Sequence, residues 1–247
     1  MRVDYHLHLE EDDVIGLCRY EPERIAVYWG MARQRGIHEI GISEHAHRFP
    51  EFREVMRHLL EPEPVAGAWW LADQFNQPLL RYIDAVTEAK TRGLPVKLGI
   101  EVDYLPGCER SVRAILARHP WDYVIGSVHF LDTWAIDVGP QYGWPEVDVD
   151  EAYRAYFRRL QQAARCGLFD ILAHPDLIKK FGHRPSFDLG PLYDEVVATL
   201  ATAGVAVELS TAGWRKPVGE PYPEPAFLER CARLGIPLVL GSDAHRP

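Results

Sequence analysis

The stretch GLFDILAHP, residues 167–175, decides the fold class of this 247-residue chain. Gly167 follows a helical pattern over 150–166, and a glycine in that place commonly ends a helix. A short apolar run over 169–173 reads as a buried strand, and a second helical pattern follows over 191–203. Short strands that alternate with longer helices indicate a mostly parallel sheet with helices on its outside.

The same rhythm runs along the whole chain. We predict strands over Arg2–His6, Glu39–Ser43, Val96–Glu101, Tyr123–Ser127, Phe169–Ala173, Val205–Leu209 and Pro237–Leu240. We predict helices over Glu23–Arg35, Pro78–Arg92, Glu109–Ala117, Asp150–Cys166, Pro191–Ala203 and Pro225–Leu234. Seven strands and six helices favour an α/β barrel with an irregular strand count, and an open doubly wound sheet is the alternative. Two long loops, over 49–77 and 133–149, should lie at the face where such barrels carry their sites.

Composition restricts the kind of protein. Apolar residues make up 47% and charged residues 26% of the chain, an ordinary balance for a soluble globular domain. The net charge of −9 disfavours nucleic acid as a partner, and no apolar run reaches the ~18 residues of a membrane helix. The four cysteines form no C-x-x-C motif, and the start of the chain has no apolar signal region. These features predict one domain over 1–247 in a reducing cytoplasm.

Histidines and carboxylates gather at the predicted strand ends. The chain has 11 histidines, and His6 and His8 share one face of an extended segment. The other strand ends carry His45, Glu101 with Asp103, His129, His174, and Asp243 with His245. Each histidine alone could be a hydrogen-bonded core or loop residue. His47 and His183 could edge the site, but we expect surface roles for them. However, six of the seven predicted strands end in such residues, and in a barrel these ends all meet at one mouth. This joint placement predicts a Zn, Fe or Mn site there.

These motifs resemble those of the polymerase-and-histidinol-phosphatase (PHP) family over nearly the whole chain. The marks are H-x-H at His6, S-E-H at Ser43, S-V-H-F at Ser127, H-P-D at His174 and D-x-H at Asp243. The segments 177–182 and 208–217 resemble the monofunctional histidinol-phosphate phosphatases of histidine biosynthesis. The resemblance implies a distorted seven-stranded barrel with a three-metal site that hydrolyses histidinol phosphate.

The resemblance also implies a ligand set. His6, His8, Glu101 and Asp243 would hold the first ion; Glu101, His129 and His174 the second; and His45 and His245 the third. The family has a further histidine soon after H-x-H, where this chain has acids. Asp13 is the expected replacement, with Glu10 and Asp12 as alternatives. Glu101 would bridge two ions, and Glu101, Asp243 and His245 are the predicted catalytic residues.

Basic residues follow the fifth and sixth strands at the same mouth. We expect Arg215, Lys216 and Lys179 to bind the substrate phosphate, with Lys180 as a further candidate. A covalent route through the C-x₅-R pattern at Cys18 is disfavoured, because its intervening acids make a poor phosphate cradle. Asp148 is better placed as a helix N-cap than as a nucleophile.

Other functions remain open at this point. The alternatives are a PHP phosphoesterase that acts on a phosphotyrosyl protein or a nucleotide, and a non-catalytic metal-binding domain. The chain ends just after Asp243 and His245, so we expect a further covering helix to be missing from it.

Overall fold

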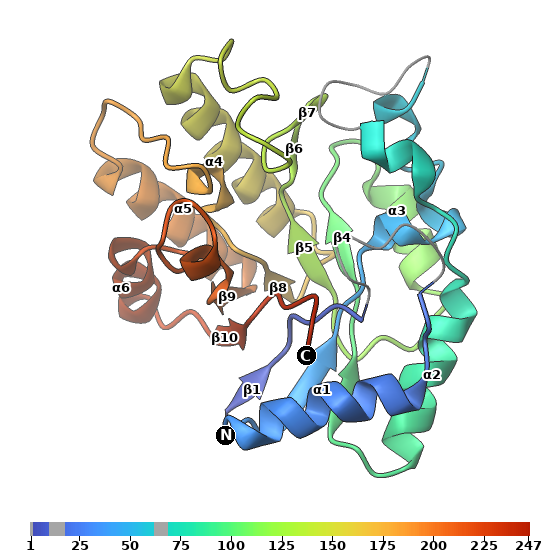
Figure 1. The fold of residues 1–247 in the computed structure, drawn as a ribbon. Coiled ribbons are helices and arrows are strands. Elements are labelled where there is room, and N and C mark those ends of the chain that lie inside the picture. Colours follow the sequence, from blue (N-terminus) through green and yellow to red (C-terminus); the bar gives the residue numbers. More distant parts are fainter. Residues whose placement is uncertain (1, 10–17, 62–68) are drawn as a thin grey trace.

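The computed structural model describes residues 2–9, 18–61 and 69–247 (Figure 1). Its helices are α1 (Pro22–Gln34), α2 (Leu79–Thr91), α3 (Glu109–Leu116), α4 (Val149–Arg165), α5 (Gly190–Ala203) and α6 (Pro225–Arg233). All six predicted helices are therefore confirmed, with ends displaced by at most a residue or two. None of the helices in these ranges has the length and apolar character needed to span a bilayer.

Local sequence explains the helix ends. The Asp148 side chain accepts hydrogen bonds from the backbone N–H groups of Asp150 and Glu151 at 2.9 and 3.2 Å, which confirms it as the N-cap of α4. Helix α5 ends at Gly204, which adopts the left-handed conformation (φ 72°) that glycine reaches at no steric cost.

The strands lie at the centre of the molecule. They are β1 (Val3–Asp4), β2 (Glu39–Ile42), β3 (Val96–Leu98), β4 (Glu101–Asp103), β5 (Ile125–Ser127), β6 (Phe130–Leu131), β7 (Trp134–Ala135), β8 (Ile171–Leu172), β9 (Ala206–Ser210) and β10 (Leu238–Gly241). Within the described ranges they form a parallel sheet β1-β2-β3, a parallel sheet β10-β9-β8-β5-β4 and the antiparallel hairpin β6-β7. The α/β class with parallel sheets is confirmed.

Backbone hydrogen bonds join the two parallel sheets on both sides. Tyr5 N–H donates to the Leu240 carbonyl at 3.1 Å, and Leu7 pairs with Ala244 beyond the end of β10. On the other side Glu101 N–H donates to the Glu44 carbonyl at 3.0 Å. The outer helices α4, α5 and α6 lie side by side (Figure 1). The rings of Phe157, Tyr193 and Phe227 pack against one another between them.

The predicted strand over Val96–Glu101 is interrupted and appears as the two strands β3 and β4. The chain pairs with β2 as far as Leu98, changes sheet at Gly99 and then pairs with β5 from Glu101 onward. The ring of Tyr123 occupies the space beside Gly99, where a Cβ atom would overlap it, and its hydroxyl donates to the Tyr5 carbonyl at 2.7 Å. This large buried side chain therefore packs against the chain at the point where it changes sheet.

The two expected loops carry little regular structure. The segment over 49–77 contains 3₁₀ turns at Pro50–Phe52, Arg57–Leu59 and Trp69–Asp73, and residues 62–68 lie outside the described ranges. The segment over 133–149 begins in the hairpin β6-β7, which the sequence did not predict. Both segments reach the carboxyl ends of the strands, where the predicted site residues lie.

Candidate metal centre

The Glu101 carboxylate, at the start of β4, lies at the centre of a group of imidazoles. Its Oε2 atom lies 2.7 Å from His45 Nδ1, 3.2 Å from His6 Nε2 and 3.5 Å from His8 Nε2. Its Oε1 atom lies 3.3 Å from His174 Nε2 and 3.6 Å from His129 Nε2. Five histidines from four separate segments thus surround one carboxylate that is 1% exposed.

Asp243 forms a second centre at the same mouth. Its Oδ1 atom lies 3.4 Å from His8 Nε2 and 3.6 Å from both His6 Nε2 and His245 Nε2. Unlike Glu101, the Asp243 side chain is 20% exposed. Asp243 therefore sits between the buried histidines and the open side of the site.

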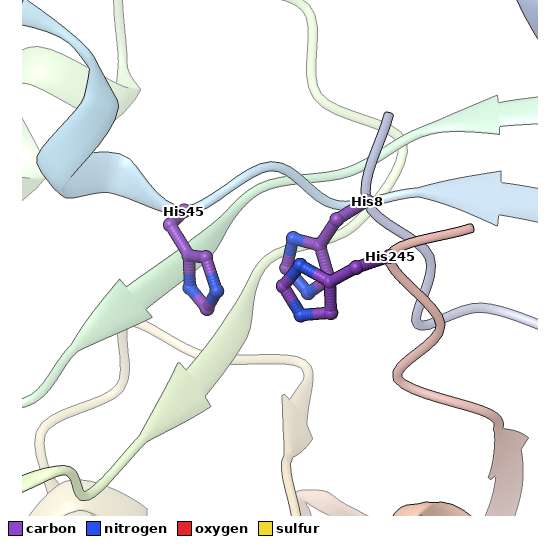
Figure 2. A group of neighbouring side chains, drawn as sticks. All are labelled: His8, His45 and His245. Carbon is purple, nitrogen blue, oxygen red and sulfur yellow. The ribbon is translucent and has the colours of Figure 1, made fainter. Parts of the chain in front are cut away.

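Side-chain atoms in this region form three overlapping groups with metal-ligand spacing. They are His6 with His8 and Asp243, His6 with Glu101 and His174, and His8 with His45 and His245; within each group the ligand atoms lie within 4.8 Å of one another. Figure 2 shows His45, from the segment after β2, pointing toward His8 and His245. The rings of His8 and His245 stack with centroids 4.3 Å apart.

Several nitrogen and oxygen atoms of the site are buried and have no hydrogen-bond partner among the described residues. They are His6 Nε2, both ring nitrogens of His8 and Glu101 Oε2. Orphaned buried nitrogen and oxygen atoms are costly unless another group satisfies them. Imidazoles and carboxylates without thiolates are suitable ligands for Zn, Fe or Mn, so the residues present fit divalent metal ions.

The electrostatics of the cluster keep the acids ionised. Burial acts to raise the pKa of Glu101, but the charges of His45 and His6 outweigh it and hold that pKa well below its usual value. The pKa of Asp243 is also well below its usual value, because His6 and His245 outweigh the effect of burial. Burial, with the charges of His45 and His245, holds the pKa of His8 well below its usual value. Burial acts to lower the pKa of His6, but Glu208 and Glu101 outweigh it and hold that pKa well above its usual value. Glu101 and Asp243 as carboxylates and His8 as a neutral imidazole are in the forms that bind metals.

Two site residues have strained backbones. His174 (φ 27°) and Asp243 (φ 50°) both lie in the left-handed region, which is unusual outside glycine. The His174 carbonyl accepts a hydrogen bond from the Tyr156 hydroxyl at 3.2 Å, and Asp243 N–H donates to the His6 carbonyl at 2.8 Å. The surrounding structure therefore fixes both residues in conformations that turn them into the site.

Glu208, on β9, orients two of the histidines. Its Oε1 atom accepts a hydrogen bond from His6 Nδ1 at 2.9 Å, and its Oε2 atom accepts one from the His174 backbone N–H at 2.7 Å. The first bond leaves His6 Nε2 free to face Glu101 and Asp243. A Cβ atom at Gly241 would overlap the Glu208 carboxylate, so this close approach requires glycine on β10. The sequence alone did not predict a role for Glu208 in the site.

Asp103 plays a similar part on the other side of the site. Its Oδ1 atom accepts a hydrogen bond from His129 Nδ1 at 2.8 Å. Burial acts to lower the pKa of His129, but Asp103 raises it to about 10. His47 lies nearby, with Nδ1 3.9 Å from Asp103 Oδ2 and its ring stacked on that of His45. His47 is 5% exposed, so the expected surface role is wrong, and burial lowers its pKa to about 3.

We expect Glu208→Gln to weaken metal binding by about 10- to 100-fold, the usual effect of losing a residue that orients a metal ligand. Glutamine offers only one acceptor oxygen, so it cannot serve both His6 and the His174 backbone. Metal content after dialysis against buffered zinc measures the change. Glu195→Gln is the matched control, since Glu195 bonds Gln161 at 3.3 Å between two helices. Unchanged zinc retention in Glu208→Gln would contradict the orienting role.

A cavity of about 110 Å³ opens beside the histidines. Its lining combines site residues with basic, acidic and aromatic side chains: His45, His129, Asp137, His174, Leu177, Lys180, Lys216, Tyr222, Asp243 and His245. Lys180 reaches across it from the segment after β8, and its Nζ atom lies 3.0 Å from Asp137 Oδ2. A second cavity of about 640 Å³ shares Lys216, Asp243 and His245 with the first and includes Arg215.

The structure does not support Lys179 as a substrate-binding residue. Its side chain is 1% exposed, and its ammonium binds Asp176 Oδ2 at 2.8 Å and the Pro221 carbonyl at 2.8 Å. The 3₁₀ turn at Leu177–Lys179 directs Lys179 inward and leaves the next residue, Lys180, at the cavity. Sequence spacing cannot distinguish two adjacent lysines, because the local turn decides which one faces the site.

The remaining predicted residues have mixed outcomes. Lys216 lines the 110 Å³ cavity. Arg215 donates from Nη2 to the Ser242 carbonyl at 2.5 Å, so its guanidinium contacts the segment that carries Asp243. Asp13 and its alternatives Glu10 and Asp12 lie outside the described residues.

Comparisons with known proteins point in one direction. The profile of the PHP domain family matches residues 21–212. A "Probable histidinol-phosphatase" of Deinococcus radiodurans is 42% identical over 193 residues, which cover 77% of this chain and 73% of the relative. The "Histidinol-phosphatase" of Bacillus subtilis is 27% identical over 237 residues, which cover 87% of this chain and 84% of the relative.

Solved structures share the fold. The hisK protein of Listeria monocytogenes superposes with a TM-score of 0.78 at 24% identity, covering 99% of this chain and 95% of that one. The histidinol phosphate phosphatase of Lactococcus lactis, in complex with zinc, L-histidinol and phosphate, gives a TM-score of 0.73 at 20% identity. That comparison covers 99% of this chain and 86% of the other.

Proposed function

The chain belongs to the PHP domain family, and from this premise we propose that it is a metal-dependent phosphatase that hydrolyses L-histidinol phosphate to L-histidinol and phosphate. The observation that carries this proposal is the convergence of His6, His8 and His174 with Glu101 and Asp243 beside a small cavity with lysines. The two relatives named above as histidinol-phosphatases support the choice of substrate.

We further propose that the chain forms one domain built as a seven-stranded barrel. The pairing of Leu7 with Ala244 supports closure on one side, and the pairing of His45 with Glu101 supports it on the other. In this arrangement β3 and β4 together count as one barrel strand. The match to the Listeria monocytogenes fold over 99% of the chain is consistent with it.

We propose that three ions occupy the site. His6, His8, Glu101 and Asp243 would hold the first, Glu101, His129 and His174 the second, and His45 and His245, with Asp13, the third. Bound divalent ions supply the charge that acidifies a water molecule and neutralises phosphoryl oxygens. Glu101 suits the bridging position because both of its oxygens face histidines.

The protein's own residues then bind the substrate and handle the proton. Lys180 and Lys216 line the cavity and attract the phosphate group. Asp243 and His245, which are 20% and 16% exposed, face the same cavity. We propose that one of them exchanges the proton that the leaving alkoxide of histidinol requires. Arg215 donates a hydrogen bond to the Ser242 carbonyl, next to Asp243. We propose it as a further ligand of the substrate phosphate.

Phosphate release from a panel of phosphate esters tests the function. We expect histidinol phosphate to give the highest kcat/KM, above a phosphotyrosyl peptide and a nucleoside monophosphate. Preference for either of the other substrates would replace the proposed specificity with another PHP phosphoesterase activity. Metal binding without turnover of any ester would favour the non-catalytic domain.

We expect Lys180→Ala to raise KM for histidinol phosphate and to lower kcat/KM by about 10-fold to 100-fold, because a hydrogen bond to a charged group is worth roughly 1.5–3 kcal/mol. Its metal content should stay normal. Lys97→Ala is the control, since Lys97 lies 40% exposed beside Glu39 at a distance of 3.8 Å. A wild-type KM in Lys180→Ala would transfer the phosphate role to Lys216 or Arg215.

A further inference from the structure

Tyr222 is a buried tyrosine at the cavity that has no role in the mechanism proposed above. It is 1% exposed, and its hydroxyl has no hydrogen-bond partner among the described residues. The residue nevertheless lines the 110 Å³ cavity together with Lys180, Lys216 and His174. Buried hydroxyl groups normally find a partner, so this one requires an explanation.

The chain holds the Tyr222 ring firmly in this place. Its backbone pairs with Ser210 at the end of β9: Tyr222 N–H donates to the Ser210 carbonyl at 3.0 Å, and Ser210 N–H donates to the Tyr222 carbonyl at 2.6 Å. The ring packs edge-on to His174, with centroids 6.4 Å apart. A Cβ atom at Gly213 would lie only 3.0 Å from Tyr222 Cζ, so the glycine makes room for the ring. The hydroxyl is therefore fixed in place before any ligand arrives.

The size of the cavity indicates which part of a substrate enters it. A water molecule takes about 30 Å³ of liquid volume, so 110 Å³ has room for about four water-sized groups. That space has room for a phosphoryl group. The lining sets Lys180 and Lys216 beside Asp137 and Asp243, and divalent ions held by the adjoining imidazoles would make this space favourable for an anion.

A tyrosine hydroxyl suits such an anion. It donates one hydrogen bond and stays neutral at physiological pH. We propose that Tyr222 donates its hydroxyl hydrogen to a phosphoryl oxygen of the substrate, and of the phosphate product, beside Lys180 and Lys216. This assignment rests on the proposed phosphatase function and adds a substrate contact to it.

The test is Tyr222→Phe, which removes one oxygen and keeps the ring. We expect kcat/KM to fall by about 10- to 100-fold, the range for a hydrogen bond to a charged group, with both histidinol phosphate and p-nitrophenyl phosphate. Inhibition by inorganic phosphate should weaken by a similar factor. Zinc content and the thermal midpoint should not fall, because the lost hydroxyl has no partner within the described protein.

Tyr193→Phe is the matched control. Tyr193 is also 1% exposed, but it packs between α4, α5 and α6 and is not part of the cavity lining. Wild-type turnover and wild-type phosphate inhibition in Tyr222→Phe would overturn the proposal. A loss with histidinol phosphate but not with p-nitrophenyl phosphate would also overturn it, because the hydroxyl would then serve the leaving group.

Direct titration with inorganic phosphate separates the two proposals. If the wild-type protein does not hydrolyse histidinol phosphate, the proposed function fails, but zinc-loaded protein still reports phosphate affinity. Weaker phosphate binding by Tyr222→Phe than by wild type and Tyr193→Phe would then support the Tyr222 contact. Equal affinity in all three proteins would refute it.

Discussion

Glu101→Gln is expected to lower kcat for histidinol phosphate by about a thousandfold or more while the protein still folds. Glutamine keeps the shape of the side chain but removes the negative charge that faces five imidazoles, at distances from 2.7 to 3.6 Å. Metal charge stabilisation is worth several kcal/mol, and each ~1.4 kcal/mol is a factor of ten in rate. Metal analysis, initial rates and circular dichroism of the same preparation measure the three quantities.

Glu39→Gln provides the control for this experiment. Glu39 begins β2 and accepts a hydrogen bond from the Tyr5 hydroxyl, but it is not in any of the three metal-ligand groups. We expect that variant to keep its metal and its turnover. A Glu101→Gln protein with full metal content and full activity would remove the bridging role and the mechanism built on it.

Removal of metal by a chelator is expected to abolish turnover and to lower the thermal midpoint by about 5–10 °C. A ligand at 100 times its Kd stabilises the folded state by ~2.7 kcal/mol, and for a chain of this size each kcal/mol shifts the midpoint by about 2–4 °C. Readdition of zinc, iron or manganese should restore both quantities. Calorimetry and activity across the three metals give the measurements and rank the metals.

The same experiment tests the covalent alternative. A cysteine nucleophile at Cys18 would remain active after chelation and would be lost in Cys18→Ser. We expect the opposite pattern: chelator-sensitive activity that survives Cys18→Ser. Chelator-resistant turnover in protein shown to be free of metal would refute the metal-dependent mechanism.

The elements were readable from the sequence where local signals define them. Helix α4 was predicted over Asp150–Cys166 and runs over Val149–Arg165, because Asp148 caps its start and Gly167 follows its end. Local signals did not predict the break in the strand over Val96–Glu101. The chain changes sheet at Gly99, where the ring of Tyr123, which is distant in sequence, fills the adjoining space. The sequence showed an apolar run and gave no sign of the ring beside it.

The sequence by itself determined the residues at the mouth of the site, because the carboxyl ends of parallel strands meet at one edge wherever the strands pair. Only the tertiary structure decided what supports them. Glu208 reaches His6 across 202 positions of sequence, and Tyr222 lines the cavity from a loop after β9. The short turn at Leu177–Lys179 places Lys180, and not Lys179, at the cavity. Contacts of this kind depend on how side chains from distant segments pack, and no local pattern of residues specifies that packing.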